Sequence, residues 1–288
     1  MKKTTIKRAV CTTLACVGVF GATALFSGCT TKNPEVKMKL TFNEKTYTLE
    51  YKLYRKIAPA TTTHFMELVE KKYYDGLCIH DFDAKDKMYT GGYTFDSTTD
   101  DNGGLVEKDY FAAAAGLGLT ATVWADEAKT TPTYTLRGEF YNNGFDVNSG
   151  ALKESYGALS FYYTSSKNDD GRLVYVKRAS DGKLDPKPYS YNSATSLFSI
   201  SLSSSATMDN NYCTFATLKG DSVDDLDKLV AAIEKYIETN YDEESEGEFA
   251  PKTNIRVDEN DPYANAKSVE YSVPEKEIRI QSIRITKY

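Results

Sequence analysis

The stretch that decides the fold is residues 57–92, which read IAPATTTHFMELVEKKYYDGLCIHDFDAKDKMYTGG. Its first part carries apolar residues at helical spacing, and proline at position 59 suits the first turn of a helix. We therefore predict a helix that opens at Pro59 and ends at Asp75 and Gly76. The second part predicts two short strands, residues 77–79 and 87–89, joined by the loop 83–86.

Working outward, strand patterns dominate the rest of the chain. Residues 36–42 and 46–54 alternate apolar and polar side chains around a turn at 43–45, which predicts a hairpin. Further strands are predicted at 197–202, 213–218 and 277–285, the last with a bulge because its apolar phase slips between Ile280 and Ile283. The best helical pattern is 221–239, with Asp221 or Ser222 as its cap and acidic residues in its first turn. This order fits a mainly β protein, a closed antiparallel barrel capped by two helices.

Three segments depart from this simple order. Residues 93–135 fit no pattern, apart from an alanine-rich part at 110–124 that reads as a short helix or a packed loop. Residues 164–191 have the polar character and Asp-Gly turn signals of an inserted hairpin. Residues 241–267 are acidic and contain proline, so we expect an exposed excursion. All three are treated as insertions in one domain, residues 36–288.

Composition limits the function classes. The chain has 288 residues, 41% hydrophobic and 26% charged, as in ordinary globular proteins. Its 22 tyrosines suit strand faces and wet binding grooves alike. The net charge is −6, and it becomes −10 without the first 28 residues, which carry four basic and no acidic side chains. This acidity argues against nucleic acid as a partner. Two histidines and no Cys/His cluster give no metal signature, so we expect no cofactor. We also expect a monomer.

The N-terminus has the pattern of a signal peptide. A basic start is followed by the uncharged run 9–26 and then by Ser27-Gly28-Cys29. This ending resembles a bacterial lipobox, which implies lipidation of Cys29, removal of residues 1–28, and a tether at 29–35. A lipid-anchored protein on the extracytoplasmic face of the cell membrane is therefore expected. An ordinary cleaved signal or an uncleaved anchor are the alternatives.

Two cysteines, Cys78 and Cys213, remain after the signal peptide and the lipidated residue are set aside. Both lie in apolar, strand-like runs, where a buried thiol behaves as a small hydrophobic group. An oxidising compartment would permit a disulfide, but the sequence does not show whether the two are close. The pairing is left open.

Taken in order, the motifs resemble those of the cyclophilin family over residues 36–288. After 57–92 come Gly-Glu-Phe at 138–140 with Asn-Gly-Phe at 143–145, the segment 157–161 (GALSF), and 192–200 (NSATSLFSI). Residues 208–212 and the Thr-Phe-Ala at 214–216 complete the series. The resemblance implies the cyclophilin barrel and peptidyl-prolyl cis-trans isomerase activity, with a proline-containing peptide or an unfolded secreted protein as the partner.

The chemistry implied by the resemblance meets an obstacle at Asp81. Rotation about an Xaa–Pro bond has a barrier of about 18–20 kcal/mol, and a cationic donor near the prolyl nitrogen lowers it. The family places an arginine there, directly after a histidine, whereas this chain has Asp81 after His80. A carboxylate has the wrong sign and no proton to donate at neutral pH. Residues 77–93 contain no arginine, and Arg137 is the weak alternative.

Other groove positions implied by the resemblance have also changed. Thr90 and Leu197 stand where glutamines are usual, Ser199 replaces a phenylalanine, and Tyr212 replaces a histidine. The full set by resemblance is Asp81, Met88, Thr90, Phe161, Leu197, Phe198, Ser199, Met208 and Tyr212. None of these residues is assigned a catalytic role.

The two histidines are interpreted as structural. His80 has no neighbour in sequence that would tune it as an acid or base, and His64 is expected to join the first helix to the barrel. Asp81 and Asp83 form a small acidic pair that would suit a cation or a basic peptide, although exposed loop aspartates are commoner. Three hypotheses follow: a lipid-anchored prolyl isomerase that assists folding, with weak or lost catalysis; an inactive peptide- or protein-binding module on the same barrel; or a structural surface scaffold.

Overall fold

The chain enters the fold as a hairpin of β1 (Glu35–Phe42) and β2 (Lys45–Leu53), as the alternation predicts. Asn43 and Glu44 both adopt positive φ, which matches the twist of the paired strands in a two-residue turn. The computed structural model describes residues 33–145, 152–163, 171–178, 181–204, 212–242, 249–256 and 268–288. The predicted signal peptide, Cys29 and Met208 lie outside these residues.

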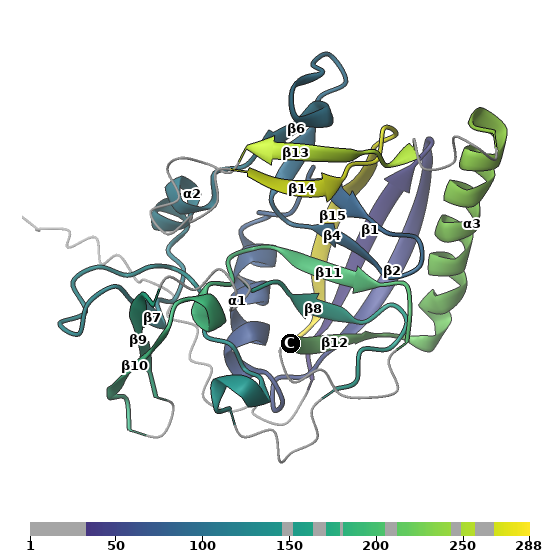
Figure 1. Cartoon of the computed structure of the whole chain (residues 1–288). Coiled ribbons are helices and arrows are strands. Elements are labelled where there is room, and N and C mark those ends of the chain that lie inside the picture. Colours follow the sequence, from purple (N-terminus) through teal and green to yellow (C-terminus); the bar gives the residue numbers. More distant parts are fainter. Residues whose placement is uncertain are drawn as a thin grey trace, which may run out of the picture. The chain divides into compact units, whose positions relative to one another are not determined.

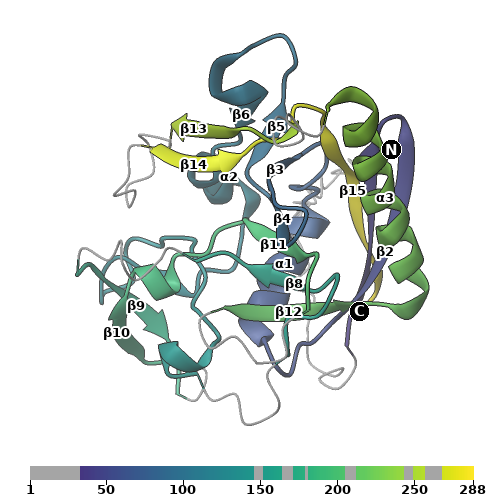
Figure 2. The same ribbon diagram turned by 45° about the vertical axis from the view of Figure 1, so that its right-hand side comes forward.

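Eight strands form one antiparallel sheet in the order β15, β1, β2, β12, β8, β11, β4, β3. The sheet curls until its edge strands meet, where Cys78 bridges Arg279 and the Gly76 N–H donates to the Ile280 carbonyl at 2.8 Å. Figure 1 and Figure 2 show this curl from two directions. The mainly β barrel fold is thus confirmed. Its other strands are β3 (Ile79–Phe82), β4 (Lys87–Thr90), β8 (Leu159–Phe161), β11 (Phe198–Ser201), β12 (Cys213–Leu218) and β15 (Ile278–Lys287).

Two helices pack on the barrel. In α1 (Pro59–Glu70) the buried face includes Phe65, Leu68 and Val69, and the helix ends before the predicted Asp75 because Lys72 turns the chain at a φ of 55°. The second, α3 (Val223–Asn240), buries Leu226, Leu229 and Ile233 and runs beside β1 and β2 (Figure 1). A third helix, α2 (Tyr110–Leu117), occupies the alanine-rich segment.

Ser222 stands at the N-terminus of α3 without capping it through its side chain. Its hydroxyl instead accepts a hydrogen bond from the Glu50 N–H in β2 at 2.8 Å. Ser222 therefore occupies the predicted cap position, but its side chain does not cap the helix. It ties the start of the helix to the barrel wall instead.

The centre of the barrel is aromatic. Phe65 from α1 meets Phe161, Phe198 and Phe215 from three strands, with ring centroids 5.0–6.4 Å apart. Such tilted and edge-to-face pairs add stabilisation beyond the area they bury. The helix and the strands of residues 57–92 are therefore held by residues distant in sequence.

The bulge predicted in the last strand is present. Lys39 of β1 pairs with Ser282 and the next residue, Leu40, pairs with Ile280, so Gln281 has no partner in the ladder. The bulge keeps both Ile280 and Ile283 buried although they are three residues apart.

The insertions form small sheets of their own. Residues 164–191 include the predicted hairpin, whose strands are joined to a strand from the segment 93–135. The segment 241–267, expected to be exposed, supplies one strand of another hairpin, and its Phe249 and Ile255 are fully buried, so that expectation is wrong for this part. The additional strands are β5 (Tyr93–Phe95), β6 (Leu105–Glu107), β7 (Val123–Trp124), β9 (Leu173–Lys177), β10 (Leu184–Pro188), β13 (Lys252–Arg256) and β14 (Ser268–Ser272).

A second, smaller hydrophobic cluster lies between two of these hairpins. Tyr93 of β5 and Leu105 of β6 pack with Ile255 of β13 and with Val273, which follows β14. Cys78 completes the cluster. Both hairpins are thereby fixed against the barrel beside β3.

Cys78 and Cys213 are free, buried thiols that belong to different hydrophobic clusters, so no disulfide joins them. Within the part of the chain that the structure describes, no helix combines the length and apolar character needed to span a membrane. The same residues contain no group of three or more His, Cys, Asp or Glu side chains placed to hold a metal ion.

Candidate functional site

The strand register separates the two faces of the barrel wall formed by β3, β4, β11 and β8. Asp81 lies opposite Tyr89, Tyr89 lies opposite Ser199, and Ser199 lies opposite Ser160. Residues that oppose each other across strands point to the same side of a sheet. Because Thr90, Phe198 and Phe161 form the alternate row and are buried in the barrel, the Asp81–Tyr89–Ser199 row lies on the outer face.

Four positions assigned to the groove by resemblance lie instead in the interior. Met88, Phe161 and Phe198 are at most 1% exposed and belong to the barrel core. Thr90 is fully buried and donates to the Cys78 carbonyl at 2.7 Å. The physical reason is the alternation of strand side chains, which turns these residues inward when Tyr89 and Ser199 face outward.

The remaining positions stay at or near the outer face. Asp81, Leu197 and Tyr212 are partly exposed. Ser199 is buried beneath the covering side chains, and its hydroxyl donates to the Ser160 carbonyl at 3.4 Å. Sequence reasoning thus located this face through Asp81, Ser199 and Tyr212, and it missed two further tyrosines that line it.

Those tyrosines are Tyr89 and Tyr162. Their rings meet edge to face, 6.1 Å apart, and Tyr162 is 38% exposed. Burial raises the pKa of both phenols, and the nearby Tyr212 raises both further. Alternation was the signal that was available, because a tyrosine between the buried Met88 and Thr90 must face outward. We call Tyr89, Tyr162 and Tyr212 the tyrosine face.

A buried ion pair borders the tyrosine face. The Lys87 ammonium lies 2.9 Å from the Glu154 carboxylate, and each side chain is 11% exposed. The same ammonium lies 5.3 Å from the centre of the Tyr212 ring. This cation is neutralised by its partner, so it does not replace the arginine that the family uses.

Asp81 itself anchors one of the added hairpins. Its Oδ1 accepts a hydrogen bond from the Ser272 N–H of β14 at 2.9 Å. Burial raises the pKa of Asp81, the Ser272 N–H lowers it, and the charge of Asp83 raises it again. Among the described residues no cation pairs with this carboxylate. In the structure, the Asp81 carboxylate therefore acts as an acceptor for a backbone N–H.

His80 lies in the adjoining hydrophobic cluster. It is 1% exposed, and its ring centre lies 4.9 Å from both Tyr93 and Tyr271. Burial lowers its pKa to about 3, so the ring is neutral at neutral pH. Its Nδ1 has no hydrogen-bond partner among the described residues. The predicted structural role is confirmed.

His64 is likewise structural. Its Nε2 lies 2.7 Å from the Thr195 carbonyl, which requires the tautomer that carries the proton on Nε2. Burial lowers its pKa as well. The predicted contact between the first helix and the barrel is confirmed.

Arg137, the alternative donor, serves elsewhere. Its guanidinium lies over the ring of Phe145, 5.0 Å from the ring centre. Arg137 also lines a pocket together with residues of β9 and β10. Its main-chain carbonyl accepts a hydrogen bond from Tyr163, the neighbour of Tyr162.

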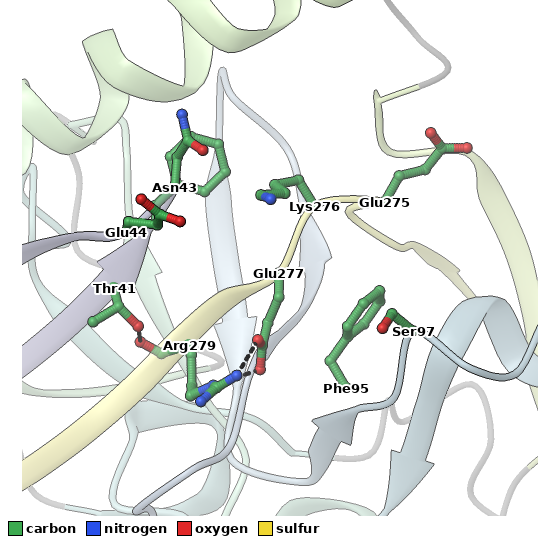
Figure 3. A pocket seen from close by; sticks show the side chains of 10 residues that line it. Thr41, Asn43, Glu44, Phe95, Ser97, Glu275, Lys276, Glu277 and Arg279 are labelled. Carbon is green, nitrogen blue, oxygen red and sulfur yellow. Dashed lines mark hydrogen bonds and ion pairs between the residues drawn. The ribbon is translucent and has the colours of Figure 1, made fainter.

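Another hollow, of about 500 Å³, lies between the turn of the first hairpin, Phe95 and the start of β15 (Figure 3). Its charges are mixed, and Glu277 binds Arg279 within it at 2.6 Å. It shares no lining residue with the tyrosine face, and its charges give it no single sign.

The comparisons with known proteins identify the family. The family model "Cyclophilin type peptidyl-prolyl cis-trans isomerase/CLD" matches residues 37–257. The chain belongs to the cyclophilin family. No curated protein matches it.

Solved cyclophilin structures are also similar to this chain. A cyclophilin-type peptidyl-prolyl cis-trans isomerase of Cryptosporidium parvum is 16% identical, with 89% of this chain and 99% of that one covered and a TM-score of 0.44. The cyclophilin of Mimivirus is 17% identical, with 91% and 93% covered and a TM-score of 0.43. In this cyclophilin-family chain, strand β14 lies beside Asp81, which accepts the hydrogen bond from the Ser272 N–H.

Proposed function

We propose that this chain is a lipid-anchored, extracytoplasmic cyclophilin-family protein that assists the folding of secreted chains by binding proline-containing segments, with little or no isomerase turnover. The observation that carries the proposal is the hydrogen bond between Asp81 and Ser272. It supports a structural role for the residue that stands in place of the catalytic arginine. Since stabilisation of the twisted prolyl bond needs a donor, loss of that donor removes the main source of rate enhancement.

Binding is supported by the tyrosine face. Tyrosine offers a large rigid ring and a polar hydroxyl, a combination that suits extended peptides and proline rings. Tyr162 is the most exposed of the three, and no added strand pairs with β8 or β11 beyond the barrel itself. The lipid anchor rests on the sequence around Cys29.

The test measures catalysis and binding separately, on a chain that begins at Thr31, the start of the larger compact unit. The cis-to-trans conversion of an Xaa–Pro peptide is expected to proceed at the rate seen in buffer. Asp81→Arg places a cationic donor at this position, so it is expected to raise that rate, and no change would mean that the site lies elsewhere. A rate above buffer in the unmodified chain would show that it is an isomerase.

Binding of the same peptide is followed by fluorescence anisotropy. Tyr162→Ala should weaken it about tenfold, the order expected when one aromatic anchor is lost. Tyr288→Ala is the matched control, because this tyrosine is 57% exposed and belongs neither to the tyrosine face nor to the pocket that Arg137 lines. Equal effects of the two substitutions, or no binding at all, would contradict a peptide-binding role for the tyrosine face.

A further inference from the structure

A second pocket, of about 300 Å³, lies between the inserted hairpin and the turn at residues 141–145. It is lined by four cations and one carboxylate in a chain whose net charge is −6. Cations gathered against the overall sign of a protein mark a surface that attracts anions. The charged lining consists of Arg137, Lys177, Arg178, Lys187 and Asp185.

The charges within this pocket do not cancel. Arg178 lies 3.5 Å from Asp185, the one carboxylate in the lining, and 3.0 Å from Asp181. Lys177 and Lys187 form no ion pair with any carboxylate among the described residues. These two lysines therefore remain uncompensated by the described carboxylates, and their mutual repulsion is relieved when an anion enters.

The floor of the pocket is rigid. Asn143 is 8% exposed, and its amide donates to the Gly138 carbonyl at 2.8 Å and to the side-chain oxygen of Asn192 at 3.0 Å. Asn192 is fully buried and donates in turn to the Pro188 carbonyl at 2.7 Å. This network joins the end of β10 to the turn at residues 141–145, so the two walls of the pocket are held together.

The pocket also has a link to the tyrosine face. The Tyr163 hydroxyl donates to the carbonyl of Arg137, and Tyr163 directly follows Tyr162. Asn192, which also lines the pocket, lies five residues before Leu197 in the sequence. An extended peptide advances about 3.3 Å per residue, so the position of an acidic residue along the peptide decides whether its side chain meets the pocket.

We propose that this pocket binds a carboxylate side chain of the peptide that occupies the tyrosine face, so that the protein selects proline-containing segments with a nearby acidic residue. The inference rests on the proposed peptide-binding function. The partly exposed Phe145 ring and the apolar Val176 in the lining suit the stem of a peptide side chain better than a compact hydrated anion. Arginine and lysine on the walls supply the charge-assisted hydrogen bonds that a carboxylate accepts.

The experiment compares pairs of peptides that differ only in carrying a carboxylate or an amide on one side chain. A series of fluorescent Xaa–Pro peptides carries glutamate, moved one position at a time along the peptide, and each has a glutamine counterpart. At the best position the glutamate peptide should bind about tenfold more tightly than its glutamine partner at low salt, which is the sum expected of two ion pairs. High salt should reduce this preference.

Substitutions then assign the preference to the pocket. The double variant Lys177→Gln with Lys187→Gln should abolish it while leaving the affinity for the glutamine peptide unchanged. Lys183→Gln is the matched control, since it removes the same charge from the same hairpin but does not line the pocket. Retention of the full preference in the double variant would overturn the proposal.

The outcomes separate the two proposals. Equal binding of glutamate and glutamine peptides overturns the acidic preference and leaves the peptide-binding function standing. Binding of neither peptide contradicts both. Inorganic phosphate that binds through Lys177 and Lys187, with no preference for the glutamate peptide, would show that the pocket takes a free anion and would overturn a peptide ligand.

Discussion

At the scale of single residues, Asp81 decides what this face of the barrel can do. The resemblance to cyclophilins aligns Asp81 with the family's arginine, and we propose that the cationic donor is missing here. The structure adds the reason that an aspartate is suited to the position, because its carboxylate holds the backbone of β14. A hydrogen bond to a charged acceptor is worth about 1.5–3 kcal/mol, so the Asp81 carboxylate stabilises the hairpin of β13 and β14.

His80 gives a prediction at the same scale. The folded pKa of about 3 lies below the ordinary 6.5, so the neutral ring is favoured in the folded state. Its contribution to stability is complete above pH 6.5 and is lost as the pH falls from 6.5 toward 3. Relative to His80→Leu, the unmodified chain should lose about 1.4 kcal/mol of unfolding free energy per pH unit in that window.

Urea unfolding of both proteins on either side of pH 6.5 measures this difference. His80→Phe serves as a second variant in case the smaller leucine leaves a cavity between Tyr93 and Tyr271. Parallel pH profiles for the unmodified chain and both variants would mean that His80 is not a buried neutral ring.

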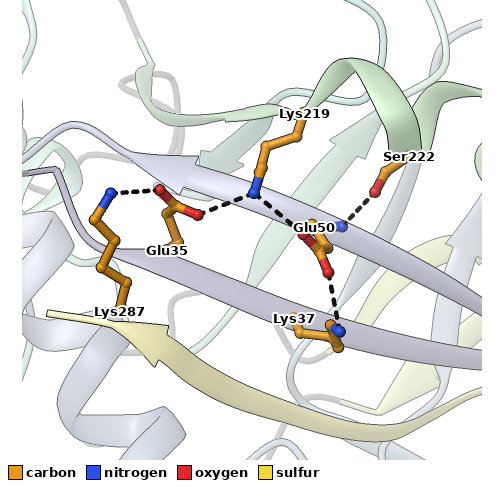
Figure 4. A network of polar contacts seen from close by, with 6 residues as sticks. All are labelled: Glu35, Lys37, Glu50, Lys219, Ser222 and Lys287. Atoms are coloured by element: carbon orange, nitrogen blue, oxygen red, sulfur yellow. Dashed lines mark hydrogen bonds and ion pairs between the residues drawn. The ribbon is translucent and has the colours of Figure 1, made fainter.

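At the scale of elements, ion pairs join strands that are far apart in the chain. Figure 4 shows Glu35 of β1 between Lys287 of β15 and Lys219, which precedes α3. Lys219 also contacts Glu50 of β2, and Lys37 contacts Glu50 at 2.9 Å. The network ties both strands of the chain's first hairpin, at the end away from its turn, to β15 and to the segment that precedes α3.

Glu35 provides the test of this network. Its hydrogen bonds with Lys287 and Lys219 lower its pKa from 4.5 to about 2, so its stabilisation is present above pH 4.5 and is lost as the pH falls toward 2. Glu35→Gln should lower the unfolding free energy by about 1 kcal/mol at neutral pH, the scale of partly exposed ion pairs. The gap should close near pH 2.

Thermal unfolding of both proteins across this range provides the measurement. Glu44→Gln is the control, because this glutamate lies exposed in the adjacent turn and makes no ion pair with the described residues. A gap between Glu35→Gln and the unmodified chain that stays constant down to pH 2 would contradict the assigned role.

At the scale of the whole molecule, the expected lipid anchor determines where the tyrosine face works. In a bacterial host, Cys29→Ser should move the protein from the membrane fraction to the soluble fraction, since a diacylated cysteine supplies the stable attachment. Cys16→Ser is the control, because it lies in the segment predicted to be removed. Mass spectrometry of the N-terminus checks the modification, and membrane association of Cys29→Ser equal to that of the control would contradict the lipoprotein prediction.

The sequence by itself determined the family, the hairpin at the start, the helix at Pro59 and the bulge at Gln281. These features depend on local spacing, turn chemistry or residue identity, all of which can be read along the chain. The sequence also located the inserted hairpin through its turn residues.

Only the tertiary structure decided which side chains face outward and what covers them. Met88, Phe161 and Phe198 turn inward because the strand register places Tyr89 and Ser199 on the other face. The acidic composition of residues 241–267 predicts an exposed segment, yet Ile255 packs with Tyr93 and Leu105 in a hydrophobic cluster. Register and packing between distant segments depend on contacts that no local pattern encodes, and these contacts place the Ser272 backbone on Asp81.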